Sequence, residues 1–364
     1  MNNKRNHLKL SGGQAVLESL RAEEVSHVFG LIGSATMELF DALYDAEDIR
    51  FIDVRDERTG THMADGYARA SGKTGIIIAG QNGPGATNLI TGIAQAKAAF
   101  SPIISIAGDI ANEHKGMDAF QEIDQQSLFE PITKKTFTIK KTSLIPNILK
   151  TAFNLATMPR CGPVHINLPR DILANMHNFD KFTKHKKKSF PLINKKDVIK
   201  ILDLIFSSKQ AVIIAGGGVK NSESHNEVIK LATLANIPIV SSAGHGDAIP
   251  FNEKLYAGQM GPRGNPIASK LVKNADVILA LGTRLGFNST FFSNEIIDNK
   301  STIIQVDIDK KSLGRYFKIE LGICNDVQNL ISQLLVELIK RHKHPVINDW
   351  TNEFLNQKTK YLKD

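Results

Sequence analysis

Residues 49–88 read IRFIDVRDERTGTHMADGYARASGKTGIIIAGQNGPGATN, and this stretch decides the fold. It contains an apolar run, an amphipathic segment and a second apolar run. Residues 49–54 predict a strand, residues 57–71 a helix and residues 75–79 a buried strand. A strand, a helix and a second strand in such close succession are typical of a βαβ unit in a parallel sheet.

The same alternation continues on both sides of this stretch. In the first half we expect further strands at 27–30, 103–107 and 164–168, and helices at 36–44 and 86–99. In the second half we expect strands at 211–215, 237–241, 277–281 and 302–307, and a helix at 327–339. Such alternation predicts parallel sheets covered on both faces. The predicted fold class is therefore α/β, with two doubly wound parallel-sheet domains.

The boundaries of these domains follow from changes in composition. The first domain is predicted at 8–175 and the second at 194–340. Residues 176–193 are Lys-rich and aperiodic and include the run KFTKHKKK, so they predict a solvated linker. Residues 341–364 are polar, and we expect them to begin a helical connection to a further domain.

Composition excludes several classes of protein. Of the 364 residues 42% are hydrophobic and 23% charged, as in soluble globular proteins. We find neither an apolar run long enough for a transmembrane helix nor an apolar signal core in the polar start, and we expect a cytoplasmic enzyme. Cys161 and Cys324 are too few for a disulfide framework or a metal site. The net charge of +8 is spread out, without a zinc-finger or RNA-binding signature, so no nucleic-acid partner is expected.

Glu57 is the first candidate for a chemical role. It follows the strand predicted at 49–54, and α/β proteins build their sites at the carboxyl ends of strands. The alternative is a structural carboxylate that interacts favourably with the dipole of the following helix. The position of Glu57 alone does not separate these two interpretations.

The segment 81–88, QNGPGATN, is the second candidate. Gly83 and Gly85 flank Pro84 and allow a ligand to approach the backbone closely, and Pro84 suits the start of a helix. The alternative is an ordinary turn, since Gly-Pro-Gly by itself is a turn signal. The spacing is that of neither a P-loop nor a dinucleotide fingerprint.

The order of the segments is more specific than any one of them. It consists of residues 29–33 (FGLIG), Glu57 ahead of 64–69 (ADGYAR), 82–88 (NGPGATN), 118–122 (DAFQE) and 167–171 (NLPRD). This order resembles the pyrimidine-binding domain of thiamine-diphosphate enzymes. Residues 215–218 (AGGG), 281–284 (LGTR) and 306–309 (VDID) resemble the central domain of the same family. The resemblance covers nearly all of residues 8–340.

The resemblance implies thiamine diphosphate as the cofactor and Glu57 as the catalytic carboxyl, placed against a ring nitrogen of the aminopyrimidine. A carboxyl there favours the imino tautomer, whose exocyclic nitrogen acts as a base on the thiazolium C2–H. The implied cofactor-binding residues are Gly33, Ser34, Glu57, Asn82, Gly83, Pro84, Gly85 and Asn88. Phe120 and Gln121 match a loop beside the cofactor and are expected near the substrate; a capped helix start is the alternative for them.

Two branches of the family compete. Residues 32–34, 79–85, 167–171, 245–250 and 282–285 resemble sulfoacetaldehyde acetyltransferase, which converts sulfoacetaldehyde and phosphate to acetyl phosphate and sulfite. Residues 118–122 and 131–134 resemble acetolactate synthase, which decarboxylates pyruvate and joins the two-carbon fragment to a 2-oxo acid. The first branch is our expectation. A non-catalytic binding or regulatory module of the same fold is an alternative of another class, and a two-lobed small-molecule-binding protein is a weaker one.

Other expectations concern what the chain does not show. FAD, which acetolactate synthases hold in the central domain, is not expected, because residues 283–288 (TRLGFN) lack an acidic pair and Gly216–Gly218 suits a tight turn. The family's Gly-Asp-Gly and, about one βα unit later, Asn-Asn motifs for Mg²⁺ and the diphosphate are not found; Gly246-Asp247 continues with Ala248, and the only Asn-Asn pair is Asn2-Asn3. We therefore expect no metal ligands here, a chain that is a fragment or has its third domain on another chain, and a complete enzyme that is a homodimer or homotetramer.

Overall fold

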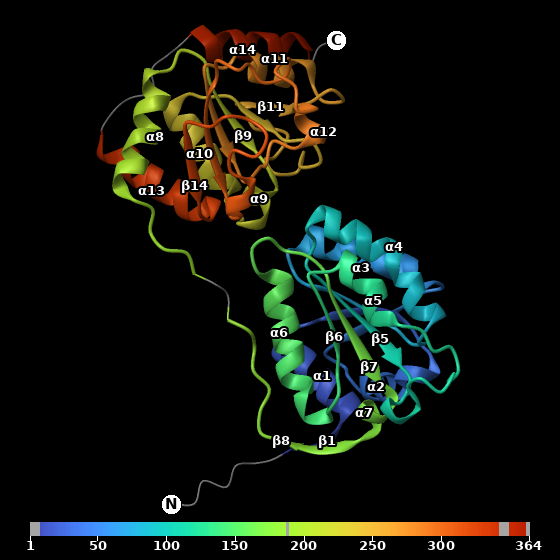
Figure 1. Cartoon of the computed structure of the whole chain (residues 1–364). Coiled ribbons are helices and arrows are strands. Elements are labelled where there is room, and N and C mark those ends of the chain that lie inside the picture. The colour runs from blue at the N-terminus through green and yellow to red at the C-terminus, as the bar shows by residue number, and fades with distance from the viewer. Residues whose placement is uncertain (1–7, 187–188, 342–348, 362–364) are drawn as a thin grey trace, which may run out of the picture. The chain divides into compact units, whose positions relative to one another are not determined.

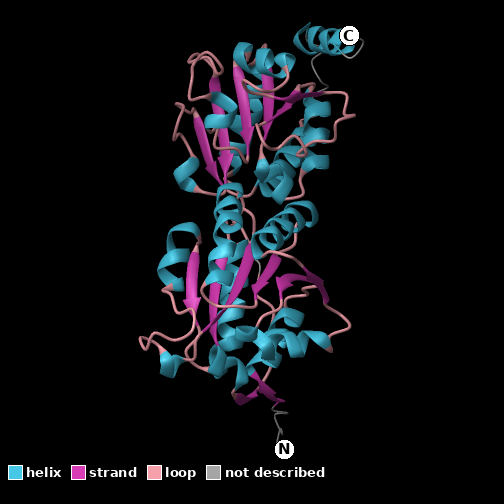
Figure 2. Ribbon diagram, turned by 90° about the vertical axis from the view of Figure 1, so that its right-hand side faces the viewer, coloured by secondary structure: helices cyan, strands magenta, loops and turns pink. Residues whose placement is uncertain are grey.

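A computed structural model describes residues 8–186, 189–341 and 349–361. The chain divides into two compact units, Met1–Lys188 and Ser189–Asp364, and each is described by itself. Each unit contains a six-stranded sheet with helices on both faces (Figure 1). Figure 2 shows these strands as a layer between helices in each unit.

The sheet of the first unit has the strand order β3-β2-β4-β5-β7-β6, and all neighbours are parallel. Its strands are β2 (His27–Leu31), β3 (Arg50–Asp53), β4 (Gly75–Ala79), β5 (Ile103–Asp109), β6 (Lys135–Thr138) and β7 (Val164–Pro169). The chain builds outward from β2 to β3 and then returns to place β4 on the other side of β2. The order therefore reverses between β2 and β4, and ligand sites of doubly wound sheets form at such a point.

Helices cover both faces of this sheet. They do so because the central strands carry apolar side chains on both faces. Ile76 and Ile78 of β4 point to one face, where they pack with α1 (Gly12–Ala22), α2 (Met37–Tyr44) and α6 (Ile145–Thr157). Ile77 and Ala79 point to the other face, where α3 (Glu57–Ser71), α4 (Pro84–Ala99) and α5 (Gln125–Phe129) lie. All four of these β4 side chains are fully buried.

A two-stranded antiparallel ribbon joins the two ends of the first unit. It consists of β1 (Leu8–Ser11) and β8 (Met176–Phe179), with Leu8 opposite Phe179. β8 follows the short helix α7 (Arg170–Ala174). The predicted linker at 176–193 is therefore wrong in its first part, because four residues there are a strand; so short a strand with three exposed side chains leaves no apolar pattern in the sequence.

Hydrogen bonds also attach parts of the predicted linker to each unit. The backbone amide of His185 donates to Oε1 of Glu23 at 2.8 Å within the first unit. In the second unit, Asn325 and Asn329 both donate their side-chain amides to the carbonyl of Pro191, at 2.9 and 2.8 Å. Residues 187–188 of the predicted linker lie outside the described residues.

The sheet of the second unit has the order β11-β10-β9-β12-β13-β14 and is also parallel throughout. Its strands are β9 (Ala211–Ala215), β10 (Ile239–Ser241), β11 (Tyr256–Gln259), β12 (Val277–Leu281), β13 (Thr302–Asp307) and β14 (Leu321–Cys324). Helices α8 (Lys195–Ser207), α10 (His225–Ala235) and α13 (Val327–Lys340) cover one face, and α11 (Pro266–Asn274) and α14 (Asp349–Tyr361) the other. The predicted fold class of two doubly wound parallel-sheet domains is confirmed.

The last helix, α14, belongs to the second unit. Phe354 is only 2% exposed, and Nε1 of Trp350 donates to the carbonyl of Ala211 at 3.1 Å. Residues 341–364 were expected to begin a helical connection to a further domain; α14 is a helix in this segment and packs beside α11 (Figure 1), and the connection itself stays a prediction. Residues 342–348 and 362–364 lie outside the described part. Within the described residues, no helix has the length and apolar character needed to cross a membrane.

Candidate functional site

The loops after β2, β3 and β4 meet at the point where the strand order reverses. The turn after β2 lies directly on the turn after β4, because the amide of Ala35 donates to the carbonyl of Gly80 at 3.0 Å. A Cβ on Gly33 would lie 2.5 Å from the same carbonyl oxygen. Only glycine fits so close an approach of two backbones. Ser34 adds a side-chain link, since its Oγ donates to Oε1 of Gln81 at 2.9 Å.

Glu57 begins α3, and its carboxylate is buried, with the residue only 5% exposed. Asp56 caps this helix by accepting from the amide of Arg58 at 2.8 Å. The side chain of Glu57 is thereby directed away from the capping role, and its Oε2 accepts a 2.9 Å hydrogen bond from Nδ2 of Asn88 on α4. The two helices are held in close contact at Gly92, where a Cβ would lie 2.5 Å from side-chain atoms of Thr61.

The second oxygen of Glu57 faces a different environment. Oε1 accepts no hydrogen bond from the described residues, and a Cβ placed on Gly85 would come within 3.1 Å of it. Glycine at this position thus leaves space beside one carboxylate oxygen of a residue that is only 5% exposed. A buried carboxyl normally requires a hydrogen-bonding partner. These features fit a ligand with a ring nitrogen that can share a proton with the carboxyl, such as the pyrimidine of thiamine diphosphate.

The Gly83-Pro84 turn places the start of α4. Gly83 has φ +55°, and a Cβ there would lie 2.4 Å from the carbonyl oxygen of Gln121. Pro84 is the first residue of α4, so this helix begins two residues earlier than residue 86, where we predicted it. Pro at the first helical position loses no hydrogen bond, because that amide has no partner within the helix.

Asn82 attaches the loop that carries Phe120 and Gln121. Its Nδ2 donates to the carbonyls of Phe120 at 2.8 Å and Gln121 at 3.1 Å. The carboxamide nitrogen of Asn82 is therefore engaged by the chain itself. Phe120 is 76% exposed, and Gln121 has φ +59° and accepts from Gln81 at 3.0 Å. The alternative of a capped helix start at Phe120 and Gln121 is wrong, because α5 begins only at Gln125.

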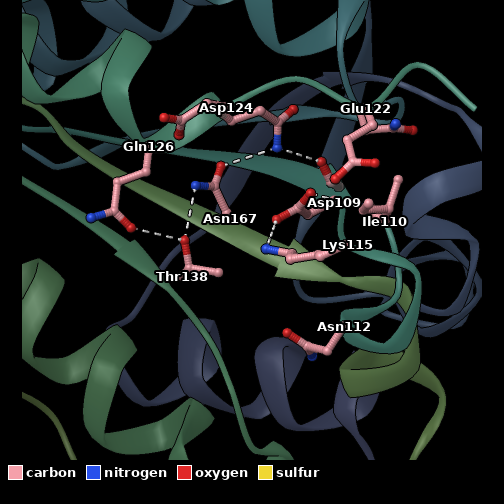
Figure 3. Close-up of polar contacts among 12 residues, drawn as sticks. Asp109, Ile110, Asn112, Lys115, Glu122, Asp124, Gln126, Thr138 and Asn167 are labelled. Carbon is pink, nitrogen blue, oxygen red and sulfur yellow. Dashed lines mark hydrogen bonds and ion pairs between the residues drawn. The ribbon is translucent and has the colours of Figure 1, made fainter. Parts of the chain in front are cut away.

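Charged groups fix the rest of this loop. Lys115 pairs with the buried Asp109 at the end of β5, with 2.8 Å between Nζ and Oδ2 (Figure 3). Glu122 accepts from the backbone amides of Gly116 at 2.7 Å and Ala119 at 3.2 Å. These hydrogen bonds, with that from Gly116 the largest cause, hold the pKa of Glu122 below its ordinary value. The loop thus has internal polar contacts that define its shape and leave Phe120 at its surface.

The structure brings the predicted cofactor residues together at one edge of the first sheet. Gly33, Ser34, Glu57, Gly85 and Asn88 come from the segments that follow three different strands, β2, β3 and β4. Three buried polar residues beneath them were missed from the sequence: Gln125, His165 and Asn167. A signal existed for two of these, since His165 and Asn167 interrupt the apolar run of β7 on alternate positions and so share one face of a central strand.

The glycine turn after β9 in the second unit is explained by contacts within the chain. A Cβ on Gly216 would lie 2.4 Å from the carbonyl oxygen of Gly282, and one on Gly218 would lie 2.5 Å from its Cα. A Cβ on Gly217 would lie 2.7 Å from the imidazole of His245. Gly216 and Gly218 are thus needed for packing against the backbone of Gly282, so the turn gives no separate argument for FAD. Within the described ranges, no cluster of three His, Cys, Asp or Glu side chains gathers as a metal site.

Two family models match the chain. Residues 10–128 match the thiamine pyrophosphate enzyme N-terminal TPP binding domain, and residues 198–334 match the thiamine pyrophosphate enzyme central domain. The matches fall one in each of the two doubly wound units and together span most of the chain. The chain therefore belongs to the thiamine-diphosphate-dependent enzyme family.

Relatives among known proteins define the group within this family. The chain is 38% identical over 340 residues to the "Probable acetolactate synthase large subunit" of Methanocaldococcus jannaschii. It is 36% identical over 350 residues to the acetolactate synthase large subunit of Buchnera aphidicola subsp. Schizaphis graminum, and 34% identical over 350 residues to the isozyme 3 large subunit of Escherichia coli. These matches cover 91–94% of this chain but only 56–61% of the relatives. The chain is thus acetolactate synthase-like and spans little more than half the length of these relatives.

Proposed function

We propose that this chain supplies the cofactor-activating part of a thiamine-diphosphate-dependent enzyme that decarboxylates pyruvate and joins the two-carbon fragment to a second 2-oxo acid. The observation that carries the proposal is the environment of Glu57. Its carboxylate is buried, is held at Oε2 by Asn88, and keeps Oε1 free beside Gly85. A structural carboxylate at a helix start would instead be expected to face solvent or backbone amides.

The role proposed for Glu57 is to bind the pyrimidine of the cofactor and to share a proton with it. Thiamine diphosphate supplies a carbon nucleophile once its thiazolium C2 proton has been removed. Oε1 of Glu57 holds a proton against a ring nitrogen of the pyrimidine, while Asn88 keeps the carboxyl in a single orientation. The turns at Gly33 and Gly83 pack against the backbone of Gly80 and Gln121, and the exposed Phe120 is proposed to contribute an apolar surface near the substrate.

The named relatives favour acetolactate synthase over sulfoacetaldehyde acetyltransferase, which was our expectation from the sequence. All three relatives named above are acetolactate synthase large subunits, at 34–38% identity. We therefore propose pyruvate as the donor substrate. We also propose, from the resemblance of both units to this enzyme family, that the complete enzyme is a homo-oligomer.

A chimera tests this proposal. The chain replaces the matching 60% of the Escherichia coli isozyme 3 large subunit, so that the relative supplies the remainder. The purified chimera receives thiamine diphosphate, Mg²⁺ and pyruvate, and acetolactate is measured; a parallel reaction contains sulfoacetaldehyde and phosphate and is assayed for acetyl phosphate. We expect acetolactate as the product.

Three outcomes would contradict the proposal. Acetyl phosphate as the main product would support the acetyltransferase branch. A folded chimera that binds the cofactor but forms neither product would favour a non-catalytic module. A folded chimera that does not bind the cofactor would argue against the site itself. Circular dichroism and a cooperative thermal transition separate these outcomes from simple misfolding.

A further inference from the structure

A chain of buried hydrogen bonds runs from the core of the first unit to the Gly83 turn. The amide of Gly83 donates to Oε1 of Gln125 at 3.1 Å. Nε2 of Gln125 donates to the carbonyl of Gly108 at 3.0 Å and to Oδ1 of Asn167 at 3.2 Å. Gln125 is 3% exposed and Asn167 only 1%. All the polar atoms of the Gln125 carboxamide are therefore used, although water does not reach it.

His165 fixes the direction of these hydrogen bonds. Burial lowers the pKa of this histidine to about 3, so its ring is neutral and carries one N–H. Its Nε2 lies 2.8 Å from Oδ1 of Asn167, and its Nδ1 lies 2.8 Å from Oγ of Ser105. We assign the proton to Nε2, because the oxygen of Asn167 can only accept while the hydroxyl of Ser105 can donate to Nδ1. Phe129 holds the ring by stacking at 3.5 Å between centroids.

This assignment leaves one orientation for each carboxamide. Oδ1 of Asn167 accepts from both His165 and Gln125, and its Nδ2 donates to Oγ1 of Thr138 at 3.2 Å. Figure 3 shows Asn167 directed at Thr138, with Gln126 on the far side of that hydroxyl. A flipped Gln125 would place its oxygen against two other oxygens and its nitrogen against the Gly83 amide. Buried groups left without hydrogen bonds in this way are costly.

We propose that Gln125 is a positioning residue for the Glu57–Asn88 site: it holds the Gly83 amide and so sets the direction of the first turns of α4. The step from Gly83 to the site is short, because Pro84 begins α4 and Asn88 lies about one turn further along the same helix. Gly83 itself has the left-handed φ of +55° and no side chain to fix it. Gln125 supplies that fixation from a helix that lies elsewhere in the sequence. The role of Gln125 in positioning a catalytic site rests on the proposed function, whereas its effect on the Gly83 turn can be measured without cofactor or substrate.

Two substitutions separate the acceptor of Gln125 from its donors. Gln125→Glu keeps an oxygen for the Gly83 amide but loses both donors, so a second carboxylate oxygen faces the oxygens of Gly108 and Asn167. Gln125→Met has a similar shape and loses every hydrogen bond. Gln126→Met is the matched control, because Gln126 is adjacent and exposed, and among the described residues its side chain bonds to Glu130 and Thr138 rather than to Gly83, Gly108 or Asn167.

The readouts are the NMR signals of the Gly83 amide and of the Asn88 side-chain amide in the selectively ¹⁵N-labelled chain, without cofactor. In Gln125→Glu the Gly83 amide proton should shift with pH as the new carboxyl titrates; burial among oxygens should place its midpoint above that of an exposed glutamate. In Gln125→Met the Gly83 amide should exchange with solvent on the order of tenfold faster, the scale of one lost hydrogen bond. The Asn88 side-chain signals should move in both variants but not in Gln126→Met.

Each result decides the inference. A Gly83 signal that is independent of pH in Gln125→Glu, together with unchanged exchange in Gln125→Met, would show that Gln125 does not hold the turn. A Gly83 response without an Asn88 response would show that Gln125 holds the turn but does not position the site. If Gln125→Glu does not fold, Gln125→Met decides alone by the same two signals. If the chimera makes no acetolactate while both signals respond, the proposed function fails and the geometric role of Gln125 stands.

Discussion

Nδ2 of Asn88 donates a 2.9 Å hydrogen bond to Oε2 of Glu57, and this contact joins α3, which follows β3, to α4, which follows β4 on the other side of β2. It fixes which carboxylate oxygen is engaged by the protein and which is left for a ligand. Since both residues lie near the first turns of their helices, small shifts of either helix start are transmitted to the carboxylate. The site therefore depends on the turns that precede α3 and α4 as much as on the two side chains.

The first prediction concerns Glu57 in the chimera described above. Glu57→Gln should lower turnover on the order of 10²–10⁴-fold, because an amide cannot share the proton of the carboxyl with the pyrimidine. The midpoint of thermal unfolding should change little, since the amide can still accept from Asn88. Steady-state rates of acetolactate formation give the measurement. Glu47→Gln, an exposed position on the same unit, is the control, and wild-type turnover in Glu57→Gln would refute the role.

The second prediction concerns the 364-residue chain by itself. We expect it to fold, to form no acetolactate, and to bind Mg²⁺ and thiamine diphosphate weakly or not at all. The pyrimidine site supplies only part of the binding energy, and charge-assisted contacts to the diphosphate would supply much of the rest. Association costs of several kcal/mol are then poorly offset. Calorimetric titration measures this, and micromolar affinity would contradict it.

The third prediction concerns pH and His165. The pKa of His165 is about 3 in the folded protein, below its ordinary value of 6.5, because the ring is buried. As pH falls below 6.5, the unfolded chain takes up a proton that the folded chain does not. Stability of the first unit should therefore be complete above pH 6.5 and fall toward pH 3, by on the order of 1 kcal/mol per pH unit from this group.

The comparison of His165→Gln with wild type isolates this contribution. Carboxylates with lowered pKa, such as Asp48 and Asp124, add acid sensitivity below about pH 4 in both proteins. Hydrogen exchange of amides in β5 and β7, corrected for the intrinsic pH dependence, reports on the first unit. Between pH 4 and 6.5 the variant should lose stability less steeply than wild type. Equal slopes would show that His165 is protonated in the folded state.

The fourth prediction concerns the buried pair of Glu23 and His185. Nδ1 of His185 lies 2.6 Å from Oε2 of Glu23, and both side chains are nearly inaccessible, at 7% and 2% exposure. Glu23→Ala should destabilise the first unit by about 3 kcal/mol, because it leaves a buried imidazole and a backbone amide without their acceptor. Hydrogen exchange of the α1 amides, measured at increasing urea concentrations, gives the change in the free energy of unfolding of the first unit. Glu24→Ala, which removes the exposed pair with Lys184, should have no measurable effect.

The fifth prediction uses the single tryptophan of the chain. Trp350 lies on α14, whose Phe354 is buried against the second unit. Phe354→Ala should destabilise the packing of α14 by about 3 kcal/mol and shift the Trp350 emission to longer wavelength as the indole becomes hydrated. Asn356→Ala, at an exposed position of the same helix, should leave the spectrum unchanged. An unshifted spectrum in Phe354→Ala would mean that α14 does not depend on this contact.

The sequence predicted the central elements well because their patterns are strong. The helix at 57–71 and the strands at 75–79, 211–215, 277–281 and 302–307 have the bounds that were expected. β6 was not predicted, because an edge strand of four residues with an exposed lysine has little apolar content. β1 and β8 were not predicted either, because they too are short strands with little apolar content. Their existence depends on pairing between residues about 170 positions apart, which no local pattern contains.

The candidate site could be predicted only in part. Gly83, Gly85 and the carboxyl of Glu57 belong to recognisable sequence motifs. The site could therefore be predicted in advance at the carboxyl ends of the strands of the first sheet. Gln125 could not, because its importance comes from contacts with Gly83, Gly108 and Asn167, which tertiary structure alone brings together. Hydrogen-bond direction within such a network is a property of the folded core and has no signature in one segment.

The ribbon of β1 and β8 also has a mechanical consequence. A load applied to the chain beyond residue 186 reaches the first unit through the Glu23–His185 contact and then through β8. β8 is antiparallel to β1, and β1 runs straight into α1, so tension would be shared with the opposite end of the unit before it reached the parallel sheet. The ribbon, with four residues in each strand, would thus carry part of such a load. Movement of the connecting segment would be absorbed at the base of the first unit, and the loops around Glu57 would be spared.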